Sequence, residues 1–251
     1  MIVESAIPII AIVVAPFVGS FLAVVIMRLV GGRSIVTGRS ACDACKHILG
    51  PAELIPLLSF VFQRGRCRHC GAPIDALHPV VEIGATTVAV WAAIVTSGWI
   101  VAASCILGWT LLTLAAIDWR TGLLPDILTV PLIGAGLLTA FLIDGPALGD
   151  HLIGAAAGFA GFVALAGIYS RIRGRAGLGL GDAKLLSAAG AWLSWIALPS
   201  VVLLAALFGM ALVLVERFRG RTIEATSRVA FGPALAAATW LVWLYGPLVP
   251  G

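Results

Sequence analysis

The sequence predicts an all-α polytopic membrane protein with about eight transmembrane helices and a small zinc-stapled subdomain between the first two. Three observations predict this fold. Hydrophobic residues make up 61% of the 251 positions and charged residues only 11%, a composition far from that of a soluble domain. Apolar runs recur along the chain, most of them near the roughly 20 residues that a membrane-crossing helix needs. One long polar segment interrupts these runs and holds four of the five cysteines.

The apolar runs give the expected helices in chain order. None shows the alternation, roughly 10 residues long, that is typical of a membrane barrel strand, so helices are the structure expected to satisfy their backbone groups in lipid. The sixth run is short, and only Pro199 and Ser200 separate it from the seventh. The eight expected spans are 6–29, 79–97, 99–117, 126–143, 151–170, 183–197, 198–215 and 229–247.

The chain is expected to have three parts: a first transmembrane helix (1–29), a cytoplasmic zinc-binding loop domain (30–78) and a multi-helix membrane domain (79–251). Its N-terminal residues 1–5 contain no basic residue, and no small-residue cleavage site follows the first apolar run. We therefore expect the first span to be retained rather than removed as a signal peptide.

Positive charge is confined to one side of the expected topology. All 16 Lys and Arg residues fall within 28–68, at Arg120, within 171–184 or within 217–228. With eight spans these places lie on the same face, which the positive-inside rule makes cytoplasmic. The pI of about 9.0 therefore indicates membrane orientation and contact with a lipid bilayer, and no nucleic-acid partner is expected.

The polar segment contains two C-x-x-C hooks with 21 residues between them. Paired hooks suit a tetrahedral zinc ion because each places two thiolates on one side of it, and a cytoplasmic loop disfavours disulfides. Four thiolates leave no open coordination position, so a structural rather than a catalytic zinc is expected. Free or redox-active thiols are the alternative. The expected zinc ligands are Cys42, Cys45, Cys67 and Cys70.

Two histidines and one further cysteine are also candidates for metal binding or thiol chemistry. His47 and His69 stand beside the hooks and are either substitute ligands or, as we favour, surface neighbours. Cys105 lies alone in an apolar span and is expected to be a small buried side chain.

Asp118 and Asp182 each stand where an apolar run meets a polar loop, on the same expected face. A carboxylate at a bilayer centre costs about 2.5–3.5 kcal/mol, so acids near a span indicate function. Two carboxyl groups brought together cannot both ionise cheaply, so one keeps a proton while the other acts as a base. Such a pair can activate water against a peptide carbonyl. The alternative is that each is solvated at a helix end.

Glycines and one lysine surround Asp182. Gly177, Gly179 and Gly181 precede it and remove three side chains, so that backbone or substrate can approach closely. Lys184 follows and is expected either to interact with the site or to anchor the helix at the membrane interface.

Two other acidic residues are expected to have structural roles. Pro125 and Asp126 are typical of a helix start, where the dipole favours an anion, so we favour capping over chemistry for Asp126. Glu82 lies early in the second span and is expected to satisfy a neighbouring helix.

Eleven ordered motifs span nearly the whole chain: Gly19–Leu22, Arg28-Leu29, Cys42–Cys45, Ile55–Ser59, Gly65–Arg68, Cys67–Cys70, Pro79–Glu82, Ile117-Asp118, Leu124–Thr129, Gly179–Lys184 and Phe231–Pro233. In this set the chain resembles the type IV prepilin peptidases, or prepilin leader peptidase/N-methyltransferases. These are membrane aspartic proteases with a glycine-x-glycine-aspartate signature.

The resemblance implies an enzyme of the bacterial cytoplasmic (inner) membrane that cuts the basic leader from prepilins or pseudopilins, for a type IV pilus or type II secretion. Asp118 and Asp182 would be the catalytic pair, supported by Gly179, Gly181, Lys184, Pro125 and Asp126. The part from 79 to 251 would then be the peptidase domain. The family also methylates the new N-terminus with S-adenosylmethionine. The residues themselves contain no glycine-rich cofactor turn after a strand, so no cofactor site is assigned.

A proton-coupled carrier and an inert zinc-stabilised scaffold are the alternative classes. A carrier would place its acids near the bilayer midplane, often with repeat symmetry. Here both aspartates lie near the basic rim and no repeat is visible, which favours the peptidase.

Overall fold

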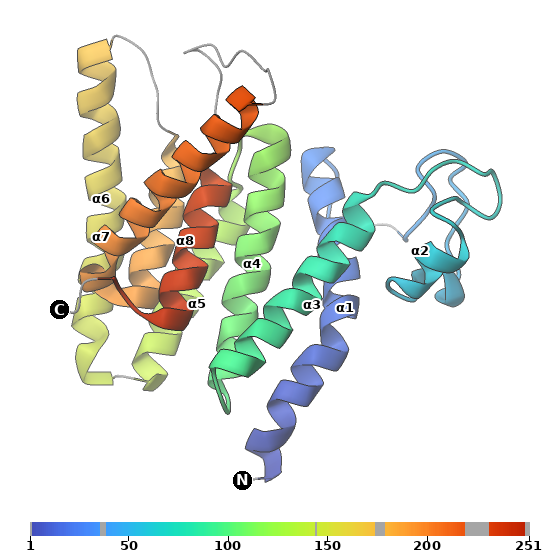
Figure 1. The fold of residues 1–251 in the computed structure, drawn as a ribbon, viewed down its shortest axis with the longest axis horizontal. Helices are drawn as coiled ribbons and strands as arrows, with labels where there is room; N and C mark the ends of the chain where they lie inside the picture. The colour runs from blue at the N-terminus through green and yellow to red at the C-terminus, as the bar shows by residue number, and fades with distance from the viewer. Residues whose placement is uncertain (1, 36–38, 144, 174–178, 219–230, 249–251) are drawn as a thin grey trace. The chain divides into compact units, whose positions relative to one another are not determined.

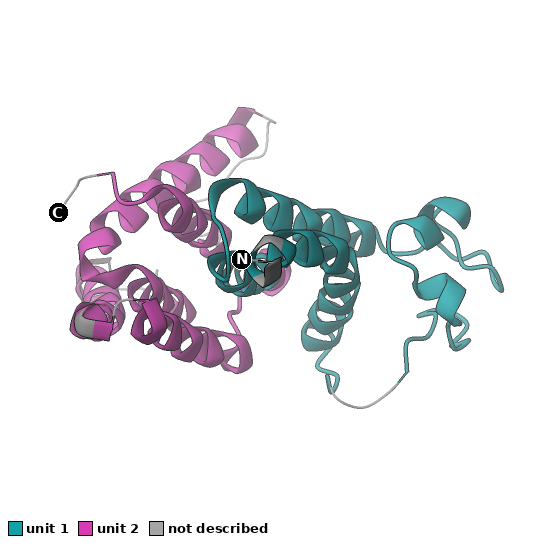
Figure 2. Cartoon of the chain, turned by 90° about the horizontal axis from the view of Figure 1, so that it is seen from below, with its two compact units in different colours: residues 1–113 teal, residues 114–251 magenta. Residues whose placement is uncertain are grey.

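The computed structural model describes residues 2–35, 39–143, 145–173, 179–218 and 231–248. Its described elements are all helices, and two isolated β-bridges occur in the polar segment. The chain forms two compact units, residues 1–113 and residues 114–251 (Figure 2). The third long helix, α4 (Ile100–Thr121), contributes residues to both units.

The first unit contains α1 (Ile2–Val30), η1 (Pro51–Leu54), α2 (Leu58–Phe62), α3 (Leu77–Val95) and the first part of α4 (Figure 1). A Cβ atom at Gly19 of α1 would lie 2.6 Å from the Cα atom of Glu82 in α3. The missing side chain therefore lets the two backbones meet, as small residues do between membrane helices. The indole Nε1 of Trp109 in α4 donates to the carbonyl of Ala85 in α3 at 2.9 Å.

The second unit contains the end of α4, then α5 (Asp126–Ile143), η2 (Gly145–Ala147), α6 (Leu148–Arg173), α7 (Leu180–Phe218) and α8 (Gly232–Tyr245). A Cβ atom at Gly190 of α7 would lie 2.1 Å from the carbonyl oxygen of Gly154 in α6. One at Gly158 would lie 2.6 Å from the carbonyl oxygen of Leu186. The glycines of α6 thus permit the close backbone contact that small residues provide between membrane helices.

The predicted membrane architecture is confirmed. Among the described residues, six helices are long and apolar enough to cross a bilayer, and α8 is a shorter apolar helix. The expected span 126–143 matches α5 at both ends, because Pro125 and Asp126 mark its start. Residues 229 and 230 of the last expected span lie outside the described residues. The six helices are Ala6–Val30, Leu77–Val95, Ile100–Thr121, Asp126–Ile143, Leu148–Ile172 and Leu180–Phe218.

The break between the sixth and seventh expected spans lies at Ser194 rather than at Pro199. Ser194 has φ 69° and ψ 173°, which interrupts the helical backbone of α7. Within α7 the chain reverses direction (Figure 1). Pro199 lies about one turn further on, near the start of the second half, where a missing backbone N–H disturbs the helix least.

Contacts along α7 agree with this reversal. Trp195, just after the break, donates to Asp150 at the start of α6 with a distance of 3.1 Å. Ser200 accepts a hydrogen bond from Leu248, beyond the end of α8, at 3.0 Å. Gly209 instead faces Phe231, just before α8 begins. The second half of α7 therefore runs antiparallel to α8.

Candidate active site and cysteine cluster

Asp118 lies in the last turn of α4 and is only 5% exposed. Its Oδ2 atom accepts a hydrogen bond from the backbone N–H of Gly232 at 3.0 Å. Gly232 begins α8, where the first N–H groups of a helix have no partner within the helix. A Cβ atom at Gly232 would lie 2.5 Å from Oδ2 of Asp118. Only glycine therefore lets the start of α8 approach this carboxyl group.

Asp182 lies in the first turn of α7 and is half-buried. Its Oδ2 atom would be 3.5 Å from a Cβ atom placed at Gly179, so the signature glycine borders the carboxyl group. Both carboxyl groups belong to the second unit, where the contact of Gly181 with Leu124 places the first turn of α7 against the connection that follows α4. Sequence reasoning placed both residues just outside their spans, whereas each lies within the terminal turn of its helix.

The signature glycines have different surroundings. A Cβ atom at Gly181 would lie 2.9 Å from Cβ of Leu124, a buried residue just before α5. Gly181 therefore permits close contact between the start of α7 and the α4–α5 connection, as the sequence predicts. Gly179 is exposed, and Gly177 lies outside the described residues.

Lys184 pairs with Asp126, with Nζ 2.5 Å from Oδ1. Asp126 is the first residue of α5, and the carbonyl of Pro125 accepts the backbone N–H groups of Leu128 and Thr129. The expected helix start is thus confirmed. The lysine takes the carboxylate at the start of α5 as its partner, and this ion pair joins α5 to the first turn of α7, which also carries Asp182.

These residues can perform acid–base chemistry. Asp118 from α4 and Asp182 from α7 provide two carboxyl groups, and the Gly232 amide of α8 fixes the position of one of them. Sequence reasoning did not assign Gly232 to the site. The signal was available in Phe231-Gly232-Pro233, because a proline in the first turn marks a helix N-terminus with free N–H groups.

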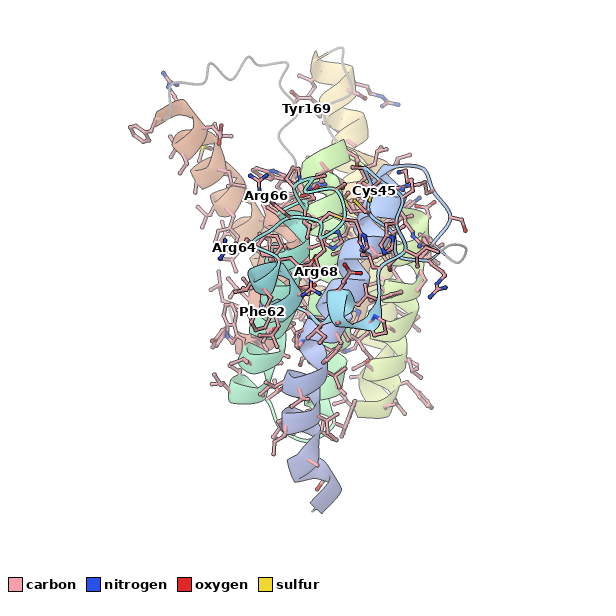
Figure 3. The ribbon with its side chains drawn as sticks, turned by 90° about the vertical axis from the view of Figure 1, so that its right-hand side faces the viewer. Cys45, Phe62, Arg64, Arg66, Arg68 and Tyr169 are labelled. Carbon is pink, nitrogen blue, oxygen red and sulfur yellow. The ribbon has the colours of Figure 1, made fainter. Side chains whose placement is uncertain are left out.

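The four hook cysteines form a cluster in the first unit. Their sulfur atoms all lie within 4.8 Å of one another, and Sγ of Cys42 is 3.8 Å from Sγ of Cys70. All four thiols are free rather than disulfide-bonded. Figure 3 shows the segment that carries them, with Cys45 and three arginines labelled. We call residues 39–76 the cysteine subdomain. Its four sulfurs could bind a metal ion.

The two hooks build the same local structure twice. In the first, the N–H of Cys42 donates to the carbonyl of His47, and the N–H of Lys46 donates to the carbonyl of Cys42, both at 2.9 Å. The second hook repeats this pattern at Cys67 and Gly71, again with two bonds of 2.9 Å. Each hook closes with an isolated β-bridge. The sequence alone did not reveal this short structural repeat.

Among the four thiols, that of Cys42 has the pKa that suits metal binding. Backbone hydrogen bonds from Cys45 and Ala44 lower the pKa of the Cys42 thiol to about 7, and the thiolate is the form that binds metal. Cys105 is buried at 2% exposure, as expected for a lone cysteine in an apolar helix.

A buried carboxylate connects the cysteine subdomain to α3. Glu82 is 5% exposed, and its Oε2 atom accepts the N–H of Leu57 at 2.7 Å. Leu57 immediately precedes α2 and has φ 60°, so this bond holds a turn of unusual backbone conformation. Glu82 was expected to satisfy a neighbouring helix, and its partner is Leu57, the residue just before α2.

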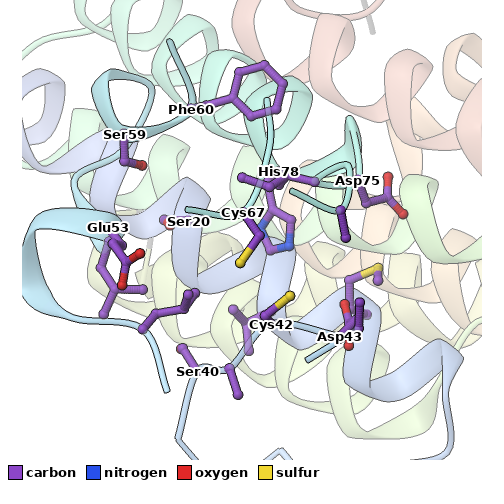
Figure 4. Close-up of a pocket in the computed structure, with 18 of the residues that line it drawn as sticks. Ser20, Ser40, Cys42, Asp43, Glu53, Ser59, Phe60, Cys67, Asp75 and His78 are labelled. Atoms are coloured by element: carbon purple, nitrogen blue, oxygen red, sulfur yellow. The ribbon is translucent and has the colours of Figure 1, made fainter. Parts of the chain in front are cut away.

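A cavity of about 410 Å³ lies in the first unit between α1, α3 and the cysteine subdomain. Figure 4 shows Glu53 on one side of it and Asp43 and Asp75 on the other. Its volume falls within the roughly 300–1,000 Å³ range of small-molecule sites. The charged residues at its wall include Arg33, Arg39, Asp43, Glu53, Asp75 and Glu82.

Comparison with known proteins identifies the family. Residues 13–96 match the model of the bacterial peptidase A24 N-terminal domain, and residues 105–214 match that of the type IV leader peptidase family. No solved structure gives a significant match.

Curated relatives of this chain carry the name prepilin leader peptidase/N-methyltransferase. The protein from Aeromonas hydrophila is 41% identical over 218 residues, which cover 85% of this chain and 73% of the relative. The Burkholderia pseudomallei protein is 43% identical, covering 83% of this chain and 67% of the relative. The Pseudomonas aeruginosa protein is 36% identical, covering 85% and 73%. The chain therefore belongs to the type IV leader peptidase family.

Proposed function

We propose that this protein is a membrane-embedded aspartic endopeptidase that removes the leader from prepilins and pseudopilins and then methylates the new N-terminus. The single observation that carries the peptidase proposal is that the first turn of α7, which carries Asp182, packs against the connection that directly follows Asp118 in α4. The names of the relatives give the substrate class.

The peptidase step follows from two carboxyl groups that share one proton. The ionised group takes a proton from water while the water oxygen bonds to the peptide carbonyl carbon, and the protonated group gives its proton to the carbonyl oxygen. The C–N bond then breaks as a proton passes to the leaving amine, and the diol returns a proton to the pair. The Gly232 amide keeps Asp118 in position.

The four cysteines fit a structural zinc ion. Four sulfurs within 4.8 Å of one another form the donor set of closed tetrahedral sites. Cys42, Cys45, Cys67 and Cys70 would hold the ion and connect the two hooks. A closed site leaves no position for substrate, so no step of peptide cleavage depends on it.

The cavity of the first unit fits S-adenosylmethionine in size and in the polar groups of its wall. Bound there, this cofactor would supply an electrophilic methyl group. Arg39 would pair with its carboxylate, Asp75 would accept hydrogen bonds from its hydroxyl or amino groups, and Phe60 would offer an aromatic face to its purine.

The enzyme would lie in the bacterial inner membrane with Asp118, Asp182 and the cysteine subdomain on the cytoplasmic side. The confinement of all 16 Lys and Arg residues to four places along the chain supports this orientation.

The test is cleavage of a purified prepilin by the full-length enzyme in detergent. We expect Asp118→Asn and Asp182→Asn each to reduce turnover by about 10²–10⁴-fold, while the melting temperature changes little. Asp150→Asn is the matched control. Asp150 lies in the first turn of α6 and accepts a hydrogen bond from Trp195 of α7. This variant should keep full turnover. Full turnover in either catalytic variant would refute the dyad.

Methyl transfer is tested separately. Titration calorimetry with S-adenosylhomocysteine should detect binding to the intact enzyme and weaker binding to Arg39→Ala. Cleaved pilin incubated with labelled S-adenosylmethionine should take up label. If the enzyme cleaves prepilin but binds no S-adenosylhomocysteine and transfers no label, the methylation proposal is refuted and the peptidase proposal still stands.

A further inference from the structure

A second group of metal-ligating side chains lies in the cysteine subdomain. One ring nitrogen each from His47 and His69 and one carboxylate oxygen of Glu53 all lie within 4.8 Å of one another. The two imidazole rings have centroids 3.4 Å apart and planes tilted by 34°. His47 follows the first hook, His69 lies within the second, and Glu53 belongs to η1. The fold thus gathers three donors from three separate segments.

One of these donors is incompletely satisfied. Oε2 of Glu53 accepts the backbone N–H of Gly50 at 2.8 Å. Oε1 of the same carboxylate is buried and has no hydrogen-bond partner among the described residues. A buried oxygen without a partner is costly, and a cation at this position would satisfy it. Both histidine side chains are exposed, so their rings can turn toward an ion.

We propose that His47, Glu53 and His69 bind a zinc ion of their own, separate from the ion of the four cysteines. Two imidazoles and one carboxylate are the protein ligands of known zinc sites in which water fills the fourth position. At the usual bond lengths the donor atoms of a tetrahedral zinc lie about 3.4 Å apart. The donor atoms lie within 4.8 Å of one another, and the two exposed rings, whose centroids are 3.4 Å apart, must turn apart so that a nitrogen of each points at the ion.

This assignment gives the two histidines a role other than substitution for a cysteine. The four sulfurs already complete one tetrahedron, so a nitrogen ligand there would have no vacant position. The second ion would tie both hooks to η1 and keep one position open to solvent. Because it has three protein ligands instead of four, it should exchange faster than the sulfur-bound ion.

Metal content of the full-length protein, purified in detergent with zinc, tests the proposal. Elemental analysis should find about two zinc ions per chain, and X-ray absorption should show both a sulfur shell and a nitrogen/oxygen shell. In His47→Ala and in Glu53→Gln the content should fall to about one ion per chain with a sulfur-only shell. Glu53→Gln keeps an oxygen for the Gly50 N–H and so preserves the local fold.

His78→Ala is the matched control. His78 lines the cavity of the same unit but is not part of the three-residue cluster, so this variant should keep about two ions per chain. One ion per chain in an all-sulfur shell, unchanged in Glu53→Gln, would overturn the proposal. Loss of both ions in Glu53→Gln, with the melting temperature unchanged, would overturn it too, because it would mean a single shared site. None of these readouts depends on peptide cleavage.

Discussion

The carboxyl group of Asp118 is held by a backbone amide, so its position depends on the residue that carries this amide. Gly232 places its N–H 3.0 Å from Oδ2 of Asp118, and it has no side chain to prevent the approach. A catalytic carboxyl group must sit within a few tenths of an ångström of its working position. Gly232 is therefore a positioning residue that acts through Asp118.

Gly232→Ala should reduce turnover by about 10–100-fold, because the new methyl group would lie 2.5 Å from Oδ2 of Asp118 and displace the carboxyl group. The measurement is kcat and KM for prepilin cleavage. We expect kcat to fall while KM stays within about twofold, since substrate binding does not use this contact.

Gly134→Ala is the control for that prediction. Gly134 lies in α5 and has no atom within 4 Å of a Cβ placed on it. Its replacement should leave kcat unchanged. Equal effects of the two substitutions on kcat would contradict the positioning role of Gly232.

The two hooks carry different residues at the fourth position after their first cysteine. Lys46 has φ 60° and Gly71 has φ 70°, so both occupy the left-handed region, which costs a non-glycine residue roughly 1–2 kcal/mol. Lys46→Gly should therefore stabilise the cysteine subdomain by about 0.5–1 kcal/mol. Gly71→Ala should destabilise it by a similar amount. Denaturant unfolding with bound metal, followed by zinc release to a coloured chelator, measures both. A weaker subdomain in Lys46→Gly would contradict this account.

At the scale of elements, the contact between α6 and the first half of α7 depends on paired glycines. Gly154 and Gly190 face one another so closely that any side chain would overlap the opposite backbone. In lipid, where apolar burial gives little driving force between helices, such close packing is a main source of association. This contact supports the helix that carries Asp182 at its start.

Gly190→Ala should lower the melting temperature of the enzyme in detergent, because its Cβ would lie 2.1 Å from the Gly154 carbonyl oxygen. Overpacking of this kind costs about 1–3 kcal/mol. Gly161→Ala, on α6 where no atom lies within 4 Å, should instead be neutral or stabilising by up to about 1 kcal/mol. Melting is followed by thiol-reactive dye or circular dichroism. If both variants melt alike, α6 and α7 do not pack through these glycines.

At the scale of the whole molecule, the sequence predicted what composition and local chemistry determine. Pro125 and Asp126 located the start of α5, and the paired hooks predicted the cysteine cluster. The turn at Ser194 was not predictable, because neither glycine nor proline marks it and tertiary packing imposes its backbone conformation. The ion pair of Lys184 with Asp126 was not predictable either, because the two residues lie far apart along the chain and only folding brings them together.

The separation of the chain into two units makes metal removal informative. The cysteines and the cavity belong to residues 1–113, whereas Asp118, Asp182 and Gly232 belong to residues 114–251. Chelation, or Cys42→Ser, should therefore unfold the cysteine subdomain before it affects peptide cleavage. Structural zinc sites contribute directly to folding, so protease sensitivity of residues 39–76 should rise first.

A time course after addition of a chelator distinguishes a structural metal ion from a catalytic one. Proteolysis within the cysteine subdomain and loss of S-adenosylhomocysteine binding should appear together, while cleavage of a short prepilin peptide continues. Asp118→Asn should give the opposite pattern, with an intact subdomain and no cleavage. If peptide cleavage instead stops while the subdomain still resists proteolysis, the metal takes part in the attack of water, and two carboxyl groups alone do not explain the reaction.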